Sequence, residues 1–251
     1  MTNFLALMVI IFLTFSCQSR QEKISKLAAE KKFVSKIFHG KNFDIFTLQK
    51  IENQSGELKI YIEGDGFAYV DESTPALDPT PRSNFLINLL LQDKAKNILY
   101  VARVCQFVKN QKCEEKYWTS ERFSKEAVAA IQEVVSGFSN FEHHLIGYSG
   151  GAAIINHLDH RKTKKITTIA GNLDLQAFTA LHKISELEEE KINYQKLSEI
   201  SQLHLVGEFD DVVPAQVFEA YKNKLPNQNK VQMKVIKNAT HEKGWGVGDL
   251  I

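Results

Sequence analysis

The stretch HHLIGYSGGAAIINHL, residues 143–158, places a serine between glycines where a short apolar run gives way to a helix-like one. Its centre, GYSGG at 147–151, fits the pattern G-x-S-x-G, which is informative when a strand precedes it and a helix follows. A turn of this kind strains the backbone of the serine, so its neighbours must be small enough for strand and helix to approach. The free N–H groups at the start of the helix then face the place where a negative oxygen would form. Ser149 is therefore the candidate nucleophile.

A serine hydroxyl is a weak nucleophile unless a base accepts its proton and an acid orients that base. In chains with this strand–turn–helix pattern, the acid and then the histidine follow the serine in sequence order. The segment HLVGEFDDVVP, 204–214, ends a strand-like run with an acidic pair. The segment VQMKVIKNATHEKGW, 231–245, ends the last strand-like run with His241. These two segments supply the candidate acid and the candidate base.

Strand-like and helix-like runs alternate along most of the chain, which predicts an α/β protein with one mostly parallel, twisted sheet covered by helices on both faces. We expect the first two strands, joined by ENQSG, to form an antiparallel hairpin at one edge of the sheet. The seven expected strands cover residues 43–51, 57–64, 97–104, 143–149, 165–172, 202–208 and 231–237. The expected helices cover 83–92, 121–138, 151–158, 175–200 and 214–225.

This pattern resembles the α/β-hydrolase superfamily over residues 43–245. The superfamily motif G-x-x-D-x-x-V-P after the next-to-last strand matches Gly207, Asp210, Val213 and Pro214. The resemblance implies a catalytic triad of Ser149, Asp210 and His241. Two other acids remain as alternatives to Asp210, namely Asp211 and, less favoured, Asp174.

The resemblance also implies an oxyanion hole formed by two backbone N–H groups. One is expected from Gly150, and the other from Asp65 or Gly66 in the loop IEGDG, where many members carry His-Gly. The Asp65 side chain is expected to cap this loop. Tyr148 and Gly64 are the candidate substrate-binding residues, with packing as the alternative for Tyr148. Trp245 is expected to anchor the loop that carries His241.

The length of 251 residues suits one sizeable domain, which we place at 43–251, after a helical lead-in at 17–42. The segment 175–200 exceeds one crossover helix, so part of it is expected to form a small cap, where His182 is a minor candidate for the pocket. The turn-rich segment 71–83 is either a binding loop or a surface excursion.

The 31 Lys and Arg residues balance 30 Asp and Glu residues, leaving a formal net charge of +1. Such a chain has no global field to attract nucleic acid, which we exclude as a partner. His157 and His160 have helical spacing, yet no cysteine or carboxylate cluster completes a metal site, and we expect neither a metal nor another cofactor.

The N-terminus MTNFLALMVIIFLTFSC holds an apolar run from residue 4 to residue 15. A helix over this run would rise about 18 Å, less than the roughly 30 Å of a bilayer core, which favours a signal peptide at 1–16 over a spanning helix. A buried N-terminal helix is the alternative. Cys17 follows in a degenerate bacterial lipobox, so lipidation is expected, with ordinary cleavage or an uncleaved anchor as alternatives.

The other two cysteines, Cys105 and Cys113, bracket the short loop CQFVKNQKC. An exported protein allows them to form a disulfide, whereas two free thiols are the alternative. This loop, together with the following YWT and with IAGNLD at 169–174, resembles a group of exported bacterial hydrolase-like lipoproteins. That resemblance implies a periplasmic or envelope location, with a membrane contact through the lipid anchor.

The sequence therefore predicts a serine hydrolase that cleaves a carboxylic ester or a related acyl bond of a small molecule. Because a fold alone does not establish activity, a non-catalytic envelope-associated binding protein is the alternative, and an acyltransferase is a third possibility.

Overall fold

The structure is a computed structural model that describes residues 18–71 and 73–250. The expected signal peptide at 1–16 and the expected lipidation site Cys17 lie outside the described residues. Within the described part of the chain, no helix is both long enough and apolar enough to cross a membrane.

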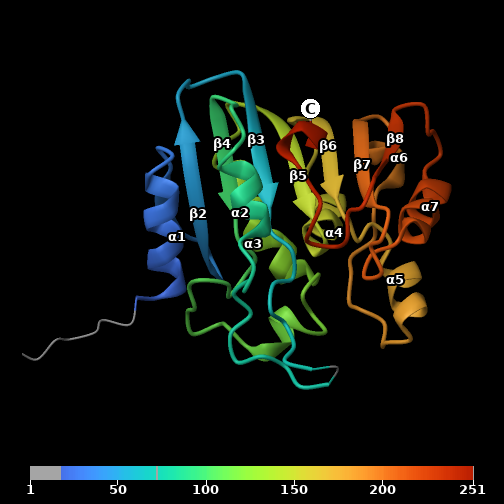
Figure 1. Ribbon diagram of the computed structural model, residues 1–251, viewed down its shortest axis with the longest axis horizontal. Helices are drawn as coiled ribbons and strands as arrows, with labels where there is room; N and C mark the ends of the chain where they lie inside the picture. Colours follow the sequence, from blue (N-terminus) through green and yellow to red (C-terminus); the bar gives the residue numbers. More distant parts are fainter. Residues whose placement is uncertain (1–17, 72, 251) are drawn as a thin grey trace, which may run out of the picture.

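A single eight-stranded sheet forms the centre of the molecule, in the order β1-β2-β4-β3-β5-β6-β7-β8 (Figure 1). The pairs β1–β2 and β2–β4 are antiparallel, and all other neighbouring strands are parallel. This mostly parallel sheet confirms the predicted architecture. The strands are β1 Val34–His39, β2 Asp44–Ile51, β3 Glu57–Ile62, β4 Asn97–Val101, β5 Glu142–Tyr148, β6 Thr163–Ile169, β7 Ser201–Gly207 and β8 Val231–Ile236.

Helices cover both faces of the sheet (Figure 1). Buried residues of α1 and α2 belong to one apolar cluster, and those of α3, α4 and α7 belong to the other, so the two groups of helices pack on opposite faces. The helices are α1 Arg20–Ala29, α2 Phe85–Leu90, α3 Lys125–Ser136, α4 Gly150–His157, α5 Leu175–His182, α6 Tyr194–Leu197 and α7 Ala215–Lys224, with 3₁₀ turns at Glu115–Trp118 and Val247–Leu250.

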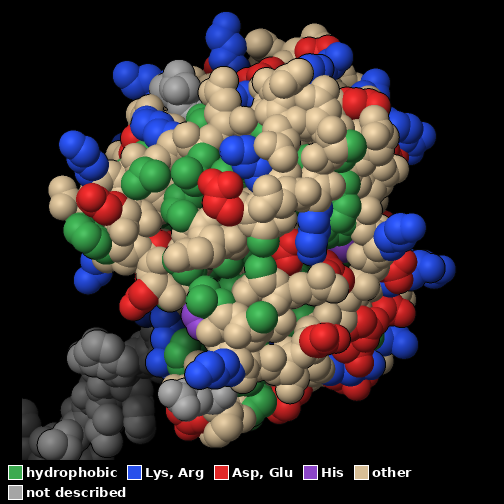
Figure 2. Space-filling view, turned by 90° about the vertical axis from the view of Figure 1, so that its right-hand side faces the viewer, with side chains coloured by type: hydrophobic (Ala, Val, Ile, Leu, Met, Phe, Trp, Pro, Cys, Tyr) green, Lys and Arg blue, Asp and Glu red, His purple; other side chains and the backbone are tan. Residues whose placement is uncertain are grey.

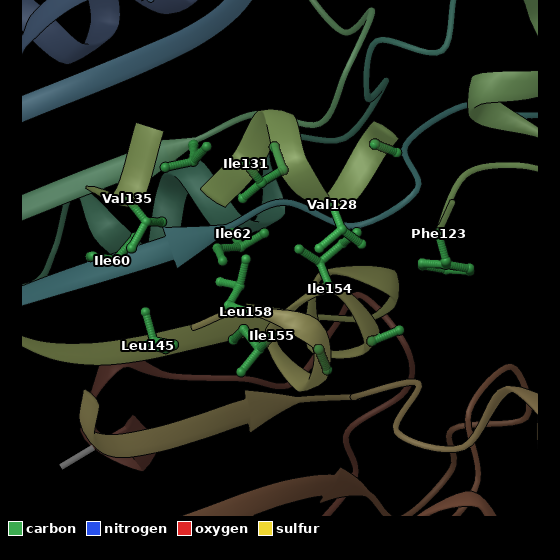
Figure 3. Close-up of a cluster of buried hydrophobic side chains, with 14 of the residues drawn as sticks. Ile60, Ile62, Phe123, Val128, Ile131, Val135, Leu145, Ile154, Ile155 and Leu158 are labelled. Carbon is green, nitrogen blue, oxygen red and sulfur yellow. The ribbon is translucent and has the colours of Figure 1, made fainter. Parts of the chain in front are cut away.

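The larger apolar cluster fixes α4, and with it the turn before α4, against the central strands (Figure 3). Ile60 and Ile62 of β3 face Ile154 and Ile155 of α4, and all four side chains are fully buried. Val128, Ile131 and Val135 of α3 close the same cluster from the other side (Figure 3). Strands buried on both faces explain the nearly continuous apolar runs of β3, β4 and β5.

The expected helical lead-in is wrong beyond residue 29. Helix α1 begins with a capping box, in which Ser19 and Glu22 exchange hydrogen bonds, and ends at Ala29. Lys32 then adopts a left-handed conformation (φ 65°), and the chain returns as the edge strand β1. Val34, Ile37 and Phe38 follow helical spacing (i, i+3, i+4), so the sequence pattern indicated a continuing helix and did not reveal the turn.

The expected edge hairpin of the first two predicted strands is also wrong. Strand β2 pairs with β1 and β4, and β3 lies further inside the sheet, between β4 and β5. Strand β4 lies between β2 and β3, so the loop that connects these two strands must cross the start of β4. The buried Asn97, the first residue of β4, binds this loop. Its Oδ1 accepts from Glu52 and Asn53 N–H at 3.1 and 3.0 Å, and its Nδ2 donates to Glu57 O at 3.1 Å.

The segment 175–200 forms two short helices, α5 and α6, in place of one long helical run. The residues between them, 183–193, have no regular structure, and most of them are exposed. Figure 2 shows basic and acidic side chains interspersed over the face that carries α5 and α7, in keeping with the near-zero net charge.

The predicted disulfide between Cys105 and Cys113 is present. The loop that it closes contacts the segment after β3. Phe107 N–H donates to Thr80 Oγ1 at 2.7 Å, and Gln106 Nε2 donates to Gly64 O at 3.0 Å. The disulfide loop therefore supports the loop at the carboxyl end of β3.

Reduction of this disulfide is expected to lower the free energy of unfolding by about 2 to 3 kcal/mol, because the short closed loop restricts the unfolded chain. Urea unfolding with and without reductant measures the difference. The double variant Cys105→Ala/Cys113→Ala is the control, since its stability should not respond to reductant. Equal stability of the oxidised and reduced wild-type protein would contradict the prediction.

Candidate active site

Ser149 lies in the sharp turn between β5 and α4, with φ 49° and ψ −120°. A non-glycine residue in this region is strained, and the turn persists because its surroundings over-determine it. A Cβ on Gly147 would lie 2.7 Å from Ala152 N, and one on Gly151 would lie 2.3 Å from Ile62 O. These two glycines are therefore required for α4 to approach β5 and β3 this closely.

The structure brings His241 and Asp210 to Ser149. His241 Nε2 lies 3.0 Å from Ser149 Oγ, and His241 Nδ1 lies 3.0 Å from Asp210 Oδ2. With its proton on Nδ1, the imidazole donates to Asp210 and accepts from the serine hydroxyl. Asp210 is 4% exposed and also accepts from the N–H groups of Val212 and Val213 at 3.0 and 2.8 Å. The carboxylate is thus held in place from both sides.

The two alternative acids lie elsewhere. Asp211 is exposed, and no hydrogen bond links it to His241. Asp174 caps α5 by accepting from Ala177 N–H at 2.9 Å, and it pairs with Lys224 at 2.6 Å. Asp210 is the acid that reaches His241.

The loop that carries His241 is anchored by Trp245. Its Nε1 donates to Thr240 O at 2.8 Å, and its ring lies 6.5 Å from that of Phe85. The ring of Tyr148 lies 5.3 Å from the His241 ring and 4.7 Å from the Phe85 ring. The imidazole therefore packs against Tyr148, which in turn packs against Phe85.

The backbone N–H groups expected to bind an oxyanion lie next to Ser149. Gly150 is the first residue of α4, so its N–H has no intrahelical acceptor. Among the described residues, no hydrogen bond uses the N–H of Asp65 or of Gly66. Gly64 packs against Ser149, since a Cβ on Gly64 would lie 3.2 Å from the Ser149 Cβ. The loop after β3 thus faces the start of α4.

The Asp65 carboxylate pairs with two buried arginines that the sequence did not indicate. Oδ1 lies 3.0 Å from Arg103 Nη1, and Oδ2 lies 2.9 Å from Arg122 Nε. Arg103 also donates to the carbonyl of Arg122. A Cβ on Gly150 would lie 2.0 Å from Asp65 Oδ1, so the carboxylate occupies the space that a larger residue would need. Asp65 therefore connects the loop after β3 to the segment 103–122, and among the described residues its carboxylate accepts no backbone N–H that would cap its own loop.

Glu63 is the second buried acid at this edge. Its Oε1 accepts from Gly64 N–H at 2.9 Å, and its Oε2 accepts from the Tyr100 hydroxyl at 2.8 Å. The pKa of Glu63 is raised to about 7, mainly by burial and in smaller part by nearby Glu242, while the two hydrogen bonds and Arg103 act to lower it. Because Glu63 uses the Gly64 N–H, that amide is not available to a substrate.

A cavity of about 390 Å³ opens above Ser149, a size suited to a small molecule. Its walls are aromatic and aliphatic side chains with charged groups between them. Phe178 of α5 and Val212 form part of the wall, so the start of the expected cap borders the cavity. The lining includes Glu63, Asp65, Gly66, Phe67, Tyr69, Arg82, Phe85, Arg122, Tyr148, Ser149, Phe178, Val212, His241 and Glu242.

Two residues that the sequence suggested for substrate binding, Gly64 and His182, do not line the cavity. Gly64 lies beneath Ser149 and does not line the cavity. His182 Nε2 donates to Val212 O at 2.7 Å, so His182 contacts a residue of the cavity wall without lining the cavity itself. In residues 18–71 and 73–250, no group of three or more His, Cys, Asp or Glu residues is arranged to hold a metal ion.

The substitution Glu63→Gln is expected to remove a pH-dependent loss of stability. The folded-state pKa of about 7 exceeds the usual 4.5, so the native state binds the extra proton and stability falls as pH rises between these values. The shift corresponds to roughly 3 kcal/mol in wild type. A glutamine keeps both hydrogen bonds, accepting from Gly64 N–H and donating to the Tyr100 oxygen.

Urea unfolding at intervals from about pH 4 to pH 8 measures this slope. The exposed Glu219→Gln on α7 is the matched control, which should retain the wild-type slope. An identical slope in wild type and Glu63→Gln would show that Glu63 does not titrate in this range.

No known family model and no curated protein matches the sequence. Solved structures do match. The chain is similar to carboxylesterase CesB from Bacillus subtilis, with 12% identity, a TM-score of 0.56, and coverage of 88% of this chain and 90% of that chain. It is similar to an alpha-beta serine hydrolase homologue from Coxiella burnetii, with 15% identity, a TM-score of 0.52, and coverage of 86% and 92%.

Est1E from Butyrivibrio proteoclasticus is a third similar structure, at 10% identity and a TM-score of 0.55, covering 86% of this chain and 93% of that chain. Identities this low establish the architecture and not the reaction. The strand order and these similarities together show that the chain has the α/β-hydrolase fold.

Proposed function

We propose that the protein is a serine hydrolase that cleaves a carboxylic ester through an acyl-enzyme. The observation that carries the proposal is the continuous chain of hydrogen-bond distances from Ser149 Oγ through His241 to Asp210, each about 3 Å. This geometry matches a nucleophile, a base and an orienting acid at the carboxyl edge of the sheet.

In this reaction, Ser149 Oγ attacks the ester carbonyl carbon while His241 Nε2 accepts the hydroxyl proton. Asp210 holds the Nδ1 proton and stabilises the imidazolium that forms. The negative oxygen of the tetrahedral intermediate binds the N–H of Gly150 and one N–H of the loop after β3, at Asp65 or Gly66. His241 then gives its proton to the departing alcohol, and a water molecule releases the acyl group by the same steps.

The cavity supports a small substrate with an apolar part. Phe67, Phe85 and Phe178 line the space above the serine and offer apolar surface to an acyl or alcohol group. Several solved structures with this fold are named as esterases or serine hydrolases, which is consistent with an ester substrate.

Ser149→Ala is expected to lower kcat/KM for a short-chain p-nitrophenyl ester by at least about 10³-fold, because the nucleophile is lost. It should also abolish labelling by a fluorophosphonate probe, which reacts with an activated serine. The exposed Ser139→Ala is the matched control and should retain both properties. Undiminished turnover by Ser149→Ala would eliminate the proposed nucleophile, and an unlabelled wild-type protein would indicate a binding module.

Asp210→Asn and Asp211→Asn test the choice of acid within one loop. An asparagine at 210 favours the wrong tautomer of His241, so kcat should fall by about 10³ to 10⁴-fold. Asp211 is exposed and makes no hydrogen bond to His241, so its variant should retain wild-type kcat. The same ester assay measures both variants. Equal losses in the two variants, or a loss in Asp211→Asn alone, would contradict the assignment.

A further inference from the structure

Exposed apolar side chains gather on the loops around the cavity. Among the described residues, the large exposed apolar side chains away from the edge strands β1 and β8 lie on loops and a helix end at the carboxyl edge of the sheet. That edge is the lower side of the sheet in Figure 1, where the arrowheads of β3, β4 and β5 point. These residues are Tyr69, Val70, Leu77, Leu181, Ile184, Phe209 and Val212.

Leu77 is the most exposed of them, at 93%. Hydrogen bonds fix its loop to the segment 109–118. Trp118 Nε1 donates to Ala76 O at 3.0 Å, and Lys109 Nζ donates to Leu77 O. Ala76 N–H also donates to Ala68 O at 2.9 Å. These hydrogen bonds fix the loop in a conformation that leaves the Leu77 side chain exposed. A fixed, exposed apolar side chain is typical of a surface that contacts a partner or a membrane.

The chain enters the fold beside this loop. Helix α1 begins at the carboxyl edge of the sheet (Figure 1). Arg20, the first residue of α1, donates through Nη2 to Arg82 O and, at 2.8 Å, to Asn84 Oδ1. Arg82 lines the cavity above Ser149. The apolar run at 4–15 therefore ends only five residues before a residue that touches the rim of the cavity.

Two cations flank the apolar loop. The Arg82 guanidinium lies 3.3 Å from the centre of the Phe67 ring, and the Lys109 ammonium lies 5.0 Å from the Trp118 ring. Within the described residues, neither cation has a carboxylate at ion-pair distance. Cationic groups beside exposed apolar side chains match an anionic bilayer surface, where headgroups meet acyl chains.

We propose that this edge docks on a lipid bilayer, with Leu77 and Val70 inserted among the acyl chains and the mouth of the cavity facing the membrane. The occupant is a bilayer because the described chain begins at this edge, at the start of α1, and the apolar run 4–15 directly precedes it in sequence. A substrate that partitions into the membrane would then reach Ser149 without crossing bulk water. The docking itself does not depend on the hydrolase activity.

Brominated-lipid quenching of an introduced tryptophan tests the orientation. The full chain is purified in the form the cell makes, incorporated into phosphatidylethanolamine–phosphatidylglycerol vesicles, and compared with vesicles whose acyl chains carry bromine near the headgroup. Leu77→Trp is the test variant. Val34→Trp is the control, because Val34 is 56% exposed and lies on the lateral edge strand β1, level with Leu99 in the middle of β4 and away from the cavity loops. The emission of the wild-type protein, which contains Trp118 and Trp245, is subtracted from the emission of each variant.

The emission added by Leu77→Trp should lose most of its intensity in the brominated vesicles, and the emission added by Val34→Trp should be unchanged. Equal quenching of the two positions, or none at either, would overturn the proposal. A blue-shifted tryptophan at 77 that bromine does not quench would show that residues 4–15 or a second copy of the chain covers the loop, which also overturns it. Circular dichroism verifies folding of both variants, and ester turnover is recorded separately.

Discussion

The strained backbone of Ser149 is the constraint on which the rest of the site depends. The turn holds φ at 49°, a value that serine rarely adopts, and both the packing of α4 against β3 and β5 and the backbone hydrogen bonds of Ser149 stabilise it. Gly147 and Gly151 allow that packing, and Ile154 and Ile155 bury it. In return, the hydroxyl projects beyond the end of the sheet, beside the free N–H of Gly150. The strained turn therefore places the hydroxyl next to a backbone N–H that has no acceptor within the helix.

Buried charge organises the loop on the other side of Ser149. Asp65 lies between Arg103 and Arg122, so each charge has a partner in a region where an isolated ion would be costly. In the part of the chain that the structure describes, Glu63 has no such ion-pair partner. Burial raises its pKa to about 7, so a large fraction of Glu63 is neutral near pH 7, which lowers the cost of burying a charge. Both carboxyl groups hold backbone or side-chain partners next to Ser149, and neither is hydrogen-bonded to its hydroxyl. The disulfide loop supports them from behind through Gln106.

Sequence patterns predicted the fold class and the residues that meet at Ser149, because both depend on local signals. The small residues around Ser149 and the spacing of Gly207, Asp210 and Pro214 are read directly from the chain. The strand order beyond nearest neighbours was not predictable, since β4 enters between β2 and β3 by long-range pairing. Arg103 and Arg122 were missed for a similar reason. Each is unremarkable in its own segment, and only the folded sheet brings both to Asp65.

The contact between Asp65 and Gly150 has a consequence for how this site changes over evolutionary time. The carboxylate fills the volume that any side chain at 150 would enter, so the two positions cannot vary independently. A relative with alanine at position 150 would need a smaller residue at position 65 or a displaced Asp65 side chain. Either change would leave the guanidinium groups of Arg103 and Arg122 without their carboxylate partner. Covariation among these four positions, rather than strict invariance of any one, is the signature that natural relatives of this chain should carry.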